Sequence, residues 1–242
     1  MARVPDSLSK SQVDKAGRTL RRVSRGEDVP AEKLRAAMQT LLRFRAVHQY
    51  PLGKTTMGLR SVVRTEGCSR VEVSQRLKRV PTIIEKLTER EATLSLPRMQ
   101  DIGGCRAVLA SMGELKRVET RLKKNRPTLD CSDYIETPRA SGYRGLHLIV
   151  GYSDEVGVVR QIEVQLRTQA MHEWAITVER ISGRLGANLK MDGDHPVQQL
   201  LEAISRAMAL EEAGMSVDGS LLTQMDELRT QAAPFLQVGG SR

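Results

Sequence analysis

The chain has 242 residues, which suffices for one large domain or two small ones. Apolar residues make up 40% and charged residues 28%, a composition that excludes an intrinsically disordered chain. Lys and Arg number 38 against 29 Asp and Glu, so the net charge of +9 favours an anionic partner such as a nucleotide, RNA, DNA or acidic lipid. Solubility alone is the other interpretation of this charge.

Two features indicate the class of protein. Cys68, Cys105 and Cys131 are odd in number and widely spaced, which argues against a disulfide framework or a zinc site. No apolar run approaches the roughly 20 residues of a membrane helix, and the first residues lack the apolar stretch of a signal peptide. We therefore expect a soluble, cytoplasmic protein without a membrane partner.

The first third of the chain has helical spacing. Helices are expected over about 9–26, 32–47 and 55–64, with Pro51 and Gly53 separating the last two. Their polar sides carry many Lys and Arg. A solvated face is the usual meaning of such charge, and nucleic-acid binding is the alternative.

The middle of the chain alternates between strand and helix patterns. Strands are expected over 71–77, 105–109, 143–152 and 158–167, and helices from Pro81, over 114–124, and from Thr168 through Trp174. The last two strands are joined by a short turn, which favours an antiparallel hairpin. The sequence therefore predicts a mixed sheet with flanking helices.

The tail is expected to be helical again. Pro196 and Gly214 stand at the start and stop of one amphipathic segment, and a second segment runs from about 220 to 235. Core packing is the favoured interpretation of the apolar stripe, with a partner surface as the alternative. We divide the chain into an N-terminal helical region (1–66), a central domain (67–190) and C-terminal helices (191–242).

Two short segments predict phosphate binding. Arg76 and Lys78 alternate at the end of a strand pattern and precede a helix, so both cations face the same side. Asp101-Ile-Gly-Gly-Cys-Arg106 places an acid, two glycines and an arginine at the entry to an apolar strand. The glycines permit a ligand to approach the backbone closely. An ordinary loop before a buried strand is the alternative.

Two further segments complete the candidate site. The loop from Asp133 through Arg139 and Tyr143 to His147 is rich in tyrosine and arginine, which suits stacking on a base next to phosphates. In the last strand Glu163, Gln165 and Arg167 alternate with apolar residues and share one face. Glu163 with Asp101 supplies the two carboxylates that suit Mg²⁺ bound to nucleotide phosphates.

The four segments occur in one order and resemble the synthetase domain of the RelA/SpoT family of nucleotide pyrophosphokinases. The resemblance implies a mixed five-stranded α/β (α+β) sheet, similar to the nucleotidyltransferase core, with helical N- and C-terminal extensions. It also implies transfer of the β,γ-pyrophosphate of ATP to a ribose 3′-hydroxyl. By position, Asp101 and Glu163 would hold Mg²⁺ and act in catalysis, with Glu163 assisting deprotonation of the hydroxyl. The implied ATP-binding residues are Arg76, Lys78, Lys86 and Arg106, and the implied acceptor-binding residues are Tyr143, Arg139, Arg144, His147, Gln165, Arg167 and His172.

Departures from the family pattern bear on the acceptor. Gly145 replaces a usual Ser, Val178-Glu179 replaces a Glu-His pair, and His172 stands where some guanosine-using members have Asn. The flanking sequence resembles a toxic branch of small alarmone synthetases, whose members place pyrophosphate on the 3′-CCA end of tRNA. A tRNA acceptor is thus the first expectation, with GDP or GTP next and adenosine nucleotides third.

The resemblance to the toxic branch implies a separate antitoxin protein as partner, and no DNA partner is expected. The net charge suits a tRNA backbone, for which we name the cluster Lys116, Arg117, Arg121, Lys123, Lys124 and Arg126. A catalytically degenerate RNA- or nucleotide-binding protein is the non-enzyme alternative. Retention of both carboxylates argues against it, because neighbouring acids repel one another without a cation between them.

Overall fold

A single mixed sheet organises the chain in the computed structural model, which describes residues 8–91, 93–185 and 195–237. The strands are β1 (Glu72–Leu77), β2 (Gly103–Leu109), β3 (Thr128–Asp133), β4 (Leu146–Ser153) and β5 (Val159–Thr168), in the order β1-β2-β5-β4-β3. Only β2 and β5 pair in parallel, whereas the other neighbours are antiparallel. The mixed five-stranded sheet and the antiparallel β4–β5 hairpin confirm the predicted fold class.

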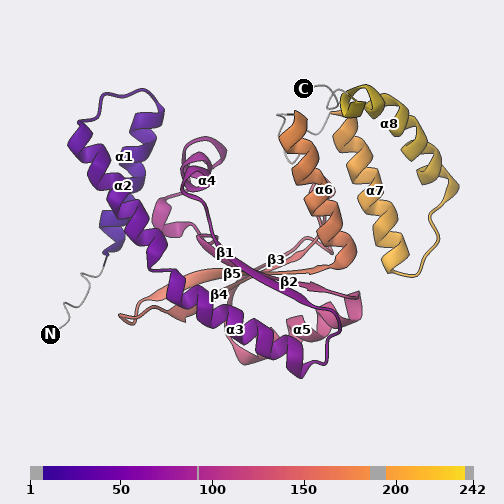
Figure 1. Cartoon of the computed structure of the whole chain (residues 1–242), viewed down its shortest axis with the longest axis horizontal. Helices are drawn as coiled ribbons and strands as arrows, with labels where there is room; N and C mark the ends of the chain where they lie inside the picture. The colour runs from indigo at the N-terminus through magenta and orange to yellow at the C-terminus, as the bar shows by residue number, and fades with distance from the viewer. Residues whose placement is uncertain (1–7, 92, 186–194, 238–242) are drawn as a thin grey trace.

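Helices lie on both sides of the sheet. The helices are α1 (Lys10–Ser24), α2 (Ala31–Ala46), α3 (Gln49–Thr65), α4 (Val80–Glu85), α5 (Met112–Asn125), α6 (Gln169–Leu185), α7 (Pro196–Glu212) and α8 (Gly219–Gln237). Helices α3 and α5 cover one face, while α1, α2 and α4 stand at one end of the other side and α6, α7 and α8 at the opposite end (Figure 1). Within the described residues no helix is both long enough and apolar enough to span a membrane.

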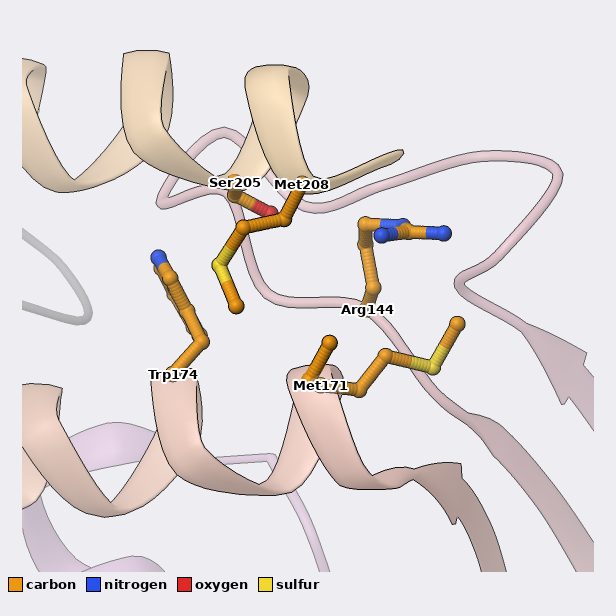
Figure 2. Close-up of a pocket in the computed structure, with 6 residues that line it drawn as sticks. Arg144, Met171, Trp174, Ser205 and Met208 are labelled. Carbon is orange, nitrogen blue, oxygen red and sulfur yellow. The ribbon is translucent and has the colours of Figure 1, made fainter. Parts of the chain in front are cut away.

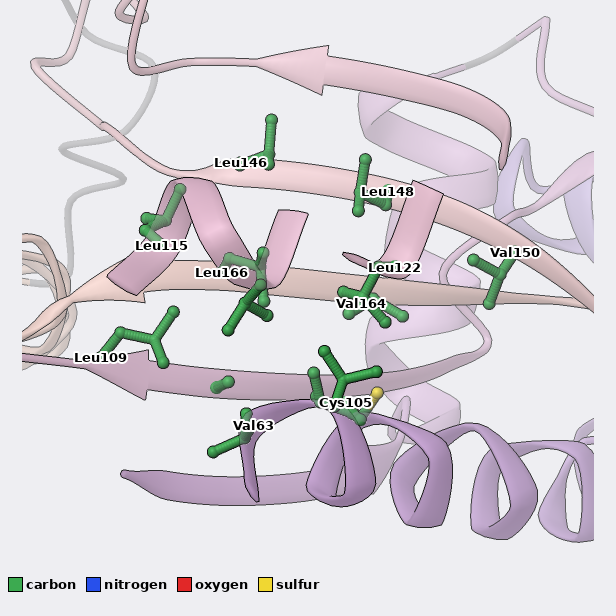
Figure 3. Packing of buried hydrophobic residues seen from close by; sticks show 14 of the residues in the cluster. Val63, Cys105, Leu109, Leu115, Leu122, Leu146, Leu148, Val150, Val164 and Leu166 are labelled. Atoms are coloured by element: carbon green, nitrogen blue, oxygen red, sulfur yellow. The ribbon is translucent and has the colours of Figure 1, made fainter. Parts of the chain in front are cut away.

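The main core lies between the sheet and helices α3 and α5. Alternate residues of the strands, such as Cys105, Leu148 and Val164, are buried against these helices (Figure 3). Because side chains alternate along a strand, the residues between them face the other side of the sheet. The apolar pattern of the strands therefore determines which face of the sheet carries the polar side chains.

Two smaller clusters support the ends of the sheet. One joins α1 and α2 to α4 and to the short helical turns η1 (Lys86–Arg90) and η2 (Leu96–Arg98). The other joins α6, α7 and α8 around Trp174. Helix α3 belongs to the sheet core, although it precedes residue 67. The proposed division into three regions stays a prediction.

Several local signals position these helices as expected. Ser9 caps α1 and exchanges hydrogen bonds with Gln12 in a capping box. Pro196 opens α7, and Gly214 follows its end with a φ of +71°. Helix α3 differs from the prediction, because it begins at Gln49 and not near residue 55. Pro51 falls in its first turn, where the missing N–H of proline leaves no helical hydrogen bond unmade.

The fifth strand, β3, carries no clear pattern in the sequence. Its residues read Thr-Leu-Asp-Cys-Ser-Asp, and three of the six are exposed while none is buried. Strand β3 is the edge of the sheet and pairs only with β4, with a register shift between Thr128 and Asp130. An edge strand that buries little apolar surface does not need alternation of apolar and polar residues, which explains why the pattern is weak.

Candidate functional site

The polar face of the sheet brings residues of all four predicted motifs into register. Arg76 of β1 lies opposite Gly104 of β2, and Gly104 lies opposite Glu163 of β5. In the next row Arg106 lies opposite Gln165, and Gln165 lies opposite His147 of β4. Side chains directly opposite each other in paired strands share one face. The register therefore gathers cations, an amide, an imidazole and a carboxylate on the face not covered by α3 and α5.

Asp101 precedes β2 and is held by two lysines. Its Oδ2 accepts hydrogen bonds from Nζ of Lys78 at 2.7 Å and from Nζ of Lys86 at 3.2 Å. Burial by itself would raise the pKa of Asp101, but the two ammonium groups outweigh it, and the net result is a pKa below the ordinary value. The Oδ1 atom is buried and has no hydrogen-bond partner among the described residues.

The second carboxylate, Glu163, is fixed by its neighbours on the face. His147 Nδ1 lies 2.9 Å from Oε1, and Nε2 of Gln165 donates to Oε2 at 2.7 Å. Burial raises the pKa of Glu163, and the hydrogen bond and charge of His147 outweigh this, so the pKa is lowered. A carboxylate with a lowered pKa is a weaker base but stays ionised, which suits a cation ligand.

Gly104 leaves the space beside Glu163 open. A Cβ built at Gly104 would lie 3.8 Å from Oε2 of Glu163. A larger side chain there would extend over the carboxylate, between Arg76 and Glu163. The absence of a side chain thus keeps the centre of the face accessible to a ligand.

The pair Asp101 and Glu163 fits a divalent cation held jointly with a substrate. No group of three or more His, Cys, Asp or Glu side chains with metal-ligand geometry occurs among the described residues. Mg²⁺ is commonly bound by one or two carboxylates together with substrate phosphates, so two carboxylates suffice. The buried, unpartnered Oδ1 of Asp101 is the kind of atom that such a cation would engage.

Arg106 and His172 form a buried polar corner beside this pair. Nε of Arg106 and Nδ1 of His172 are buried without hydrogen-bond partners in the part of the chain that the structure describes. Burial, then the charges of Arg167 and Arg76, lower the pKa of Arg106. Burial, then Arg106 and Arg167, lower the pKa of His172, which favours a neutral imidazole. Unsatisfied buried donors and acceptors of this kind are expected where a ligand completes the hydrogen bonds.

An aromatic cluster stands at the other end of the face. The hydroxyl of Tyr143 lies 2.6 Å from Nε2 of His147 and accepts a hydrogen bond from Nη2 of Arg167 at 2.8 Å. The guanidinium of Arg139 lies over the ring of Tyr134 at 4.3 Å, and Tyr134 contacts Tyr143 edge-on at 5.7 Å. Burial raises the pKa of Tyr143, so its hydroxyl stays protonated.

Tyr134 was absent from the predicted site residues, although it stands inside the motif that supplied them. It makes ring contacts to Tyr143 and His147 and a hydrogen bond from Arg139 to its hydroxyl. The signal in the sequence was the presence of two of the four tyrosines of the chain in one short loop.

Some predicted residues lie apart from this constellation. Arg144 is buried and its Nη1 donates to Oε2 of Glu212 on α7 at 2.7 Å, so its guanidinium is directed away from the face. The six cations predicted for the tRNA backbone belong to α5 and its end, in the layer that covers the opposite face of the sheet (Figure 1). Within that cluster Lys116 and Lys123 pair with Glu119, and Arg121 pairs with Glu66.

Comparison with known proteins identifies the family of the chain. Residues 75–180 match the family described as "Region found in RelA / SpoT proteins". The GTP pyrophosphokinase YjbM of Bacillus subtilis is 32% identical over 142 residues, covering 55% of this chain and 66% of that protein. The GTP pyrophosphokinase YwaC of Bacillus subtilis is 30% identical over 155 residues, covering 59% of this chain and 70% of that protein.

Solved structures agree with the fold. The small alarmone synthetase 1 of Bacillus subtilis bound to its product pppGpp superposes with a TM-score of 0.63 at 25% identity, covering 81% of this chain and 99% of that one. The small alarmone synthetase 2 of the same organism superposes with a TM-score of 0.61, covering 77% and 98%. The matched residues 75–180 include Asp101, Glu163, the cations predicted to bind phosphate and the loop that carries Tyr134 and Tyr143. The chain belongs to the RelA/SpoT family and is a pyrophosphokinase of the small alarmone synthetase type.

Proposed function

We propose that the chain transfers the β,γ-pyrophosphate of ATP to a ribose 3′-hydroxyl, and that its acceptor is the 3′-CCA end of tRNA. The observation that carries the reaction is the pair of ionised carboxylates, Asp101 and Glu163, on a face that also carries several Lys and Arg side chains. A polyphosphate needs such cations to hold it in line with the attacking hydroxyl.

Asp101 and Glu163 are the residues that would hold Mg²⁺ on this face. Bound there with the phosphates, the cation would neutralise charge that develops on the transferred group. Lys78 and Lys86 neutralise Asp101 until the substrate is present and lie close enough to contact phosphate oxygens. The lowered pKa of Glu163 makes charge stabilisation its stronger contribution, and proton removal from the 3′-hydroxyl the weaker one.

The donor and acceptor would occupy opposite ends of the face. Arg76 on the edge strand β1 and Arg106 on its neighbour β2 suit the adenine and phosphates of ATP. Tyr143, with the guanidinium groups of Arg139 and Arg167 beside it, suits a base and its phosphate. Glu163 and His147 lie between the two ends, where the 3′-hydroxyl of the acceptor would meet the pyrophosphate.

The positive charge of helix α1, near the end of the face proposed to bind ATP, supports a tRNA acceptor. Helix α1 carries Lys10, Lys15, Arg18, Arg21 and Arg22 against a single acid, Asp14. Arg18 pairs with Asp14 and Arg22 with Glu27, and the net charge of the helix stays positive. This helix packs on η1, which bears Lys86, because Nε of Arg21 donates to the carbonyl of Leu87. A basic surface that borders the catalytic face attracts a polyanion, whereas a mononucleotide needs no such surface. The α5 cluster lies behind the sheet and is the weaker candidate for this contact.

GDP or GTP is the second candidate acceptor. The names of the two curated relatives favour it, since both are GTP pyrophosphokinases, and so does the product pppGpp in the related crystal structure. Modification of tRNA would make the chain a growth-inhibiting toxin that needs a separate neutralising antitoxin, whereas alarmone synthesis would not.

A transfer assay separates these functions. Purified protein is incubated with Mg²⁺ and γ-labelled ATP. Separate reactions contain deacylated tRNA, GDP, GTP or no added acceptor. Periodate-oxidised tRNA, which lacks an intact 3′-terminal ribose, is the matched control. Label on intact but not oxidised tRNA supports the proposal. Label on GDP or GTP alone replaces it with alarmone synthesis, and label in the ATP-only reaction indicates an adenosine acceptor. Absence of both label transfer and AMP indicates a degenerate binding protein.

A further inference from the structure

The loop between β3 and β4, residues 138–145, packs against helix α7, and we call it the acceptor loop. Gly142 adopts a φ of +85°, and a Cβ built on it would lie 2.8 Å from Cα of Glu202 and 3.2 Å from the Cβ of Ser205. The loop carries Arg139 and Tyr143, two of the acceptor residues. Its backbone thus meets α7 with no room for a side chain at Gly142.

Buried hydrogen bonds hold this contact. Oγ of Ser205 donates to the carbonyl of Gly142 at 2.6 Å, and Nε1 of Trp174 on α6 donates to the carbonyl of Leu201 on α7 at 2.7 Å. Figure 2 shows Arg144, Trp174 and Ser205 converging between α6 and α7. The gap that they line has no room for a water molecule. The joint between loop and helix is therefore dry, which makes its polar contacts costly to break.

Glu212, at the end of α7, joins the loop to β5. Its Oε2 accepts from Nη1 of Arg144 at 2.7 Å, and its Oε1 accepts from Oγ1 of Thr168. Arg144 follows Tyr143 in the chain, and Thr168 follows Arg167, whose guanidinium donates to the Tyr143 hydroxyl. The two partners of Glu212, Arg144 and Thr168, are therefore adjacent in the chain to Tyr143 and Arg167, which belong to the proposed acceptor end. One carboxylate on α7 thus binds both the acceptor loop and the end of β5.

We propose that Glu212 is a positioning residue that sets the acceptor loop through Arg144 and Thr168, and that α7 thereby controls acceptor binding without contacting ATP. This inference rests on the proposed function, since it assigns the Tyr143 end of the face to the acceptor. Loss of the carboxylate leaves the Arg144 guanidinium, only 7% exposed, without its counter-charge. The loop then shifts, and misplacement of about 1 Å costs on the order of 100-fold in rate.

The first measurement is independent of activity. Amide hydrogen exchange of residues 138–146 is compared in the wild type, Glu212→Gln and Glu211→Gln. Glu211 is the matched control because it is the adjacent, exposed carboxylate of the same helix. Faster exchange in the loop of Glu212→Gln alone is expected. Equal exchange in the three proteins would overturn the inference, whatever the acceptor proves to be.

The second measurement separates positioning from general destabilisation. Glu212→Gln is expected to raise the acceptor KM about tenfold or more while the ATP KM stays within about twofold. Arg144→Gln should do the same, and the double variant should be no worse than the more affected single variant. A parallel rise of both KM values, or additive effects of the two changes, would overturn the proposal. A wild type that transfers pyrophosphate to no acceptor would refute the proposed function instead, and the exchange measurement would still decide the role of Glu212.

Discussion

Lys78 and Lys86 both bind the same oxygen of Asp101, at 2.7 and 3.2 Å, and leave the other oxygen of that carboxylate buried without a partner among the described residues. The two lysines thereby keep Asp101 ionised in a partly buried position. The same arrangement leaves one oxygen available to a cation. This relationship explains how a site rich in positive charge retains a carboxylate that can bind metal.

Replacing Asp101 with Asn should abolish pyrophosphate transfer and preserve the fold. The amide keeps the shape of the side chain but loses the charge that a divalent cation needs, and we expect AMP release to fall by about 10²–10³-fold or more. AMP release is measured with saturating ATP, and unfolding in urea checks the fold. Asp226→Asn is the control, because Asp226 pairs with Arg229 at the surface. A variant at Asp101 that keeps a tenth of the wild-type rate would contradict the assigned role.

Replacing Tyr143 with Phe should weaken acceptor binding more than ATP binding. The change removes a hydroxyl that contacts His147 and accepts hydrogen bonds from Arg167, while the ring remains. Hydrogen bonds to charged groups contribute about 1.5–3 kcal/mol, so the acceptor KM should rise roughly tenfold or more. Steady-state kinetics with each substrate varied measures the effect. Tyr50→Phe, at an exposed tyrosine of α3, should change neither KM.

Replacing Gly142 with Ala should destabilise the protein. The alanine would need the left-handed backbone at a φ of +85°, and its Cβ would meet the backbone of α7 at 2.8 Å. Strain of this kind costs about 1–3 kcal/mol, measured as a lower free energy of unfolding in urea. Gly183→Ala makes the same change in α6, where no atom of a neighbouring element in the described residues lies within 4 Å of the new methyl group. That control should stabilise the helix by about 0.5–1 kcal/mol, and equal effects of the two changes would refute the close contact.

Acidification should destabilise the fold through His48. Burial, then the charge of Arg160, lower the pKa of His48 from 6.5 to about 4, although its hydrogen bond to the Phe44 carbonyl and the charge of Asp154 oppose this shift. Below pH 6.5 His48 becomes protonated in the unfolded chain but stays neutral in the folded protein. The free energy of unfolding therefore falls as the pH decreases toward 4. The expected slope approaches about 1.4 kcal/mol per pH unit, measured by urea unfolding at pH 7.5, 5.5 and 4.5.

The variant His48→Gln removes this titration and serves as the comparison. Its stability relative to the wild type should improve steadily as the pH falls through this window. A difference between the two proteins that is constant with pH would show that His48 does not titrate in this way.

Much of the site could be predicted from local sequence. The alternation of Glu163, Gln165 and Arg167 with apolar residues placed all three on one face of a strand, because strand geometry alone requires it. The short turn between the two apolar runs likewise required an antiparallel hairpin. The outer strand β3 escaped prediction, since an exposed edge strand needs no apolar alternation.

The sequence by itself determined which residue types alternate, where most helices lie, and that a carboxylate precedes one strand and another lies within a second. Only the tertiary structure decided that β2 and β5 pair in parallel, which places Gly104 opposite Glu163 and brings the motifs to one face. It also directed Arg144 to Glu212, 68 residues away, and put the α5 cations behind the sheet. Strand order and contacts between distant segments depend on how apolar faces are buried together, and local spacing carries no information about that choice.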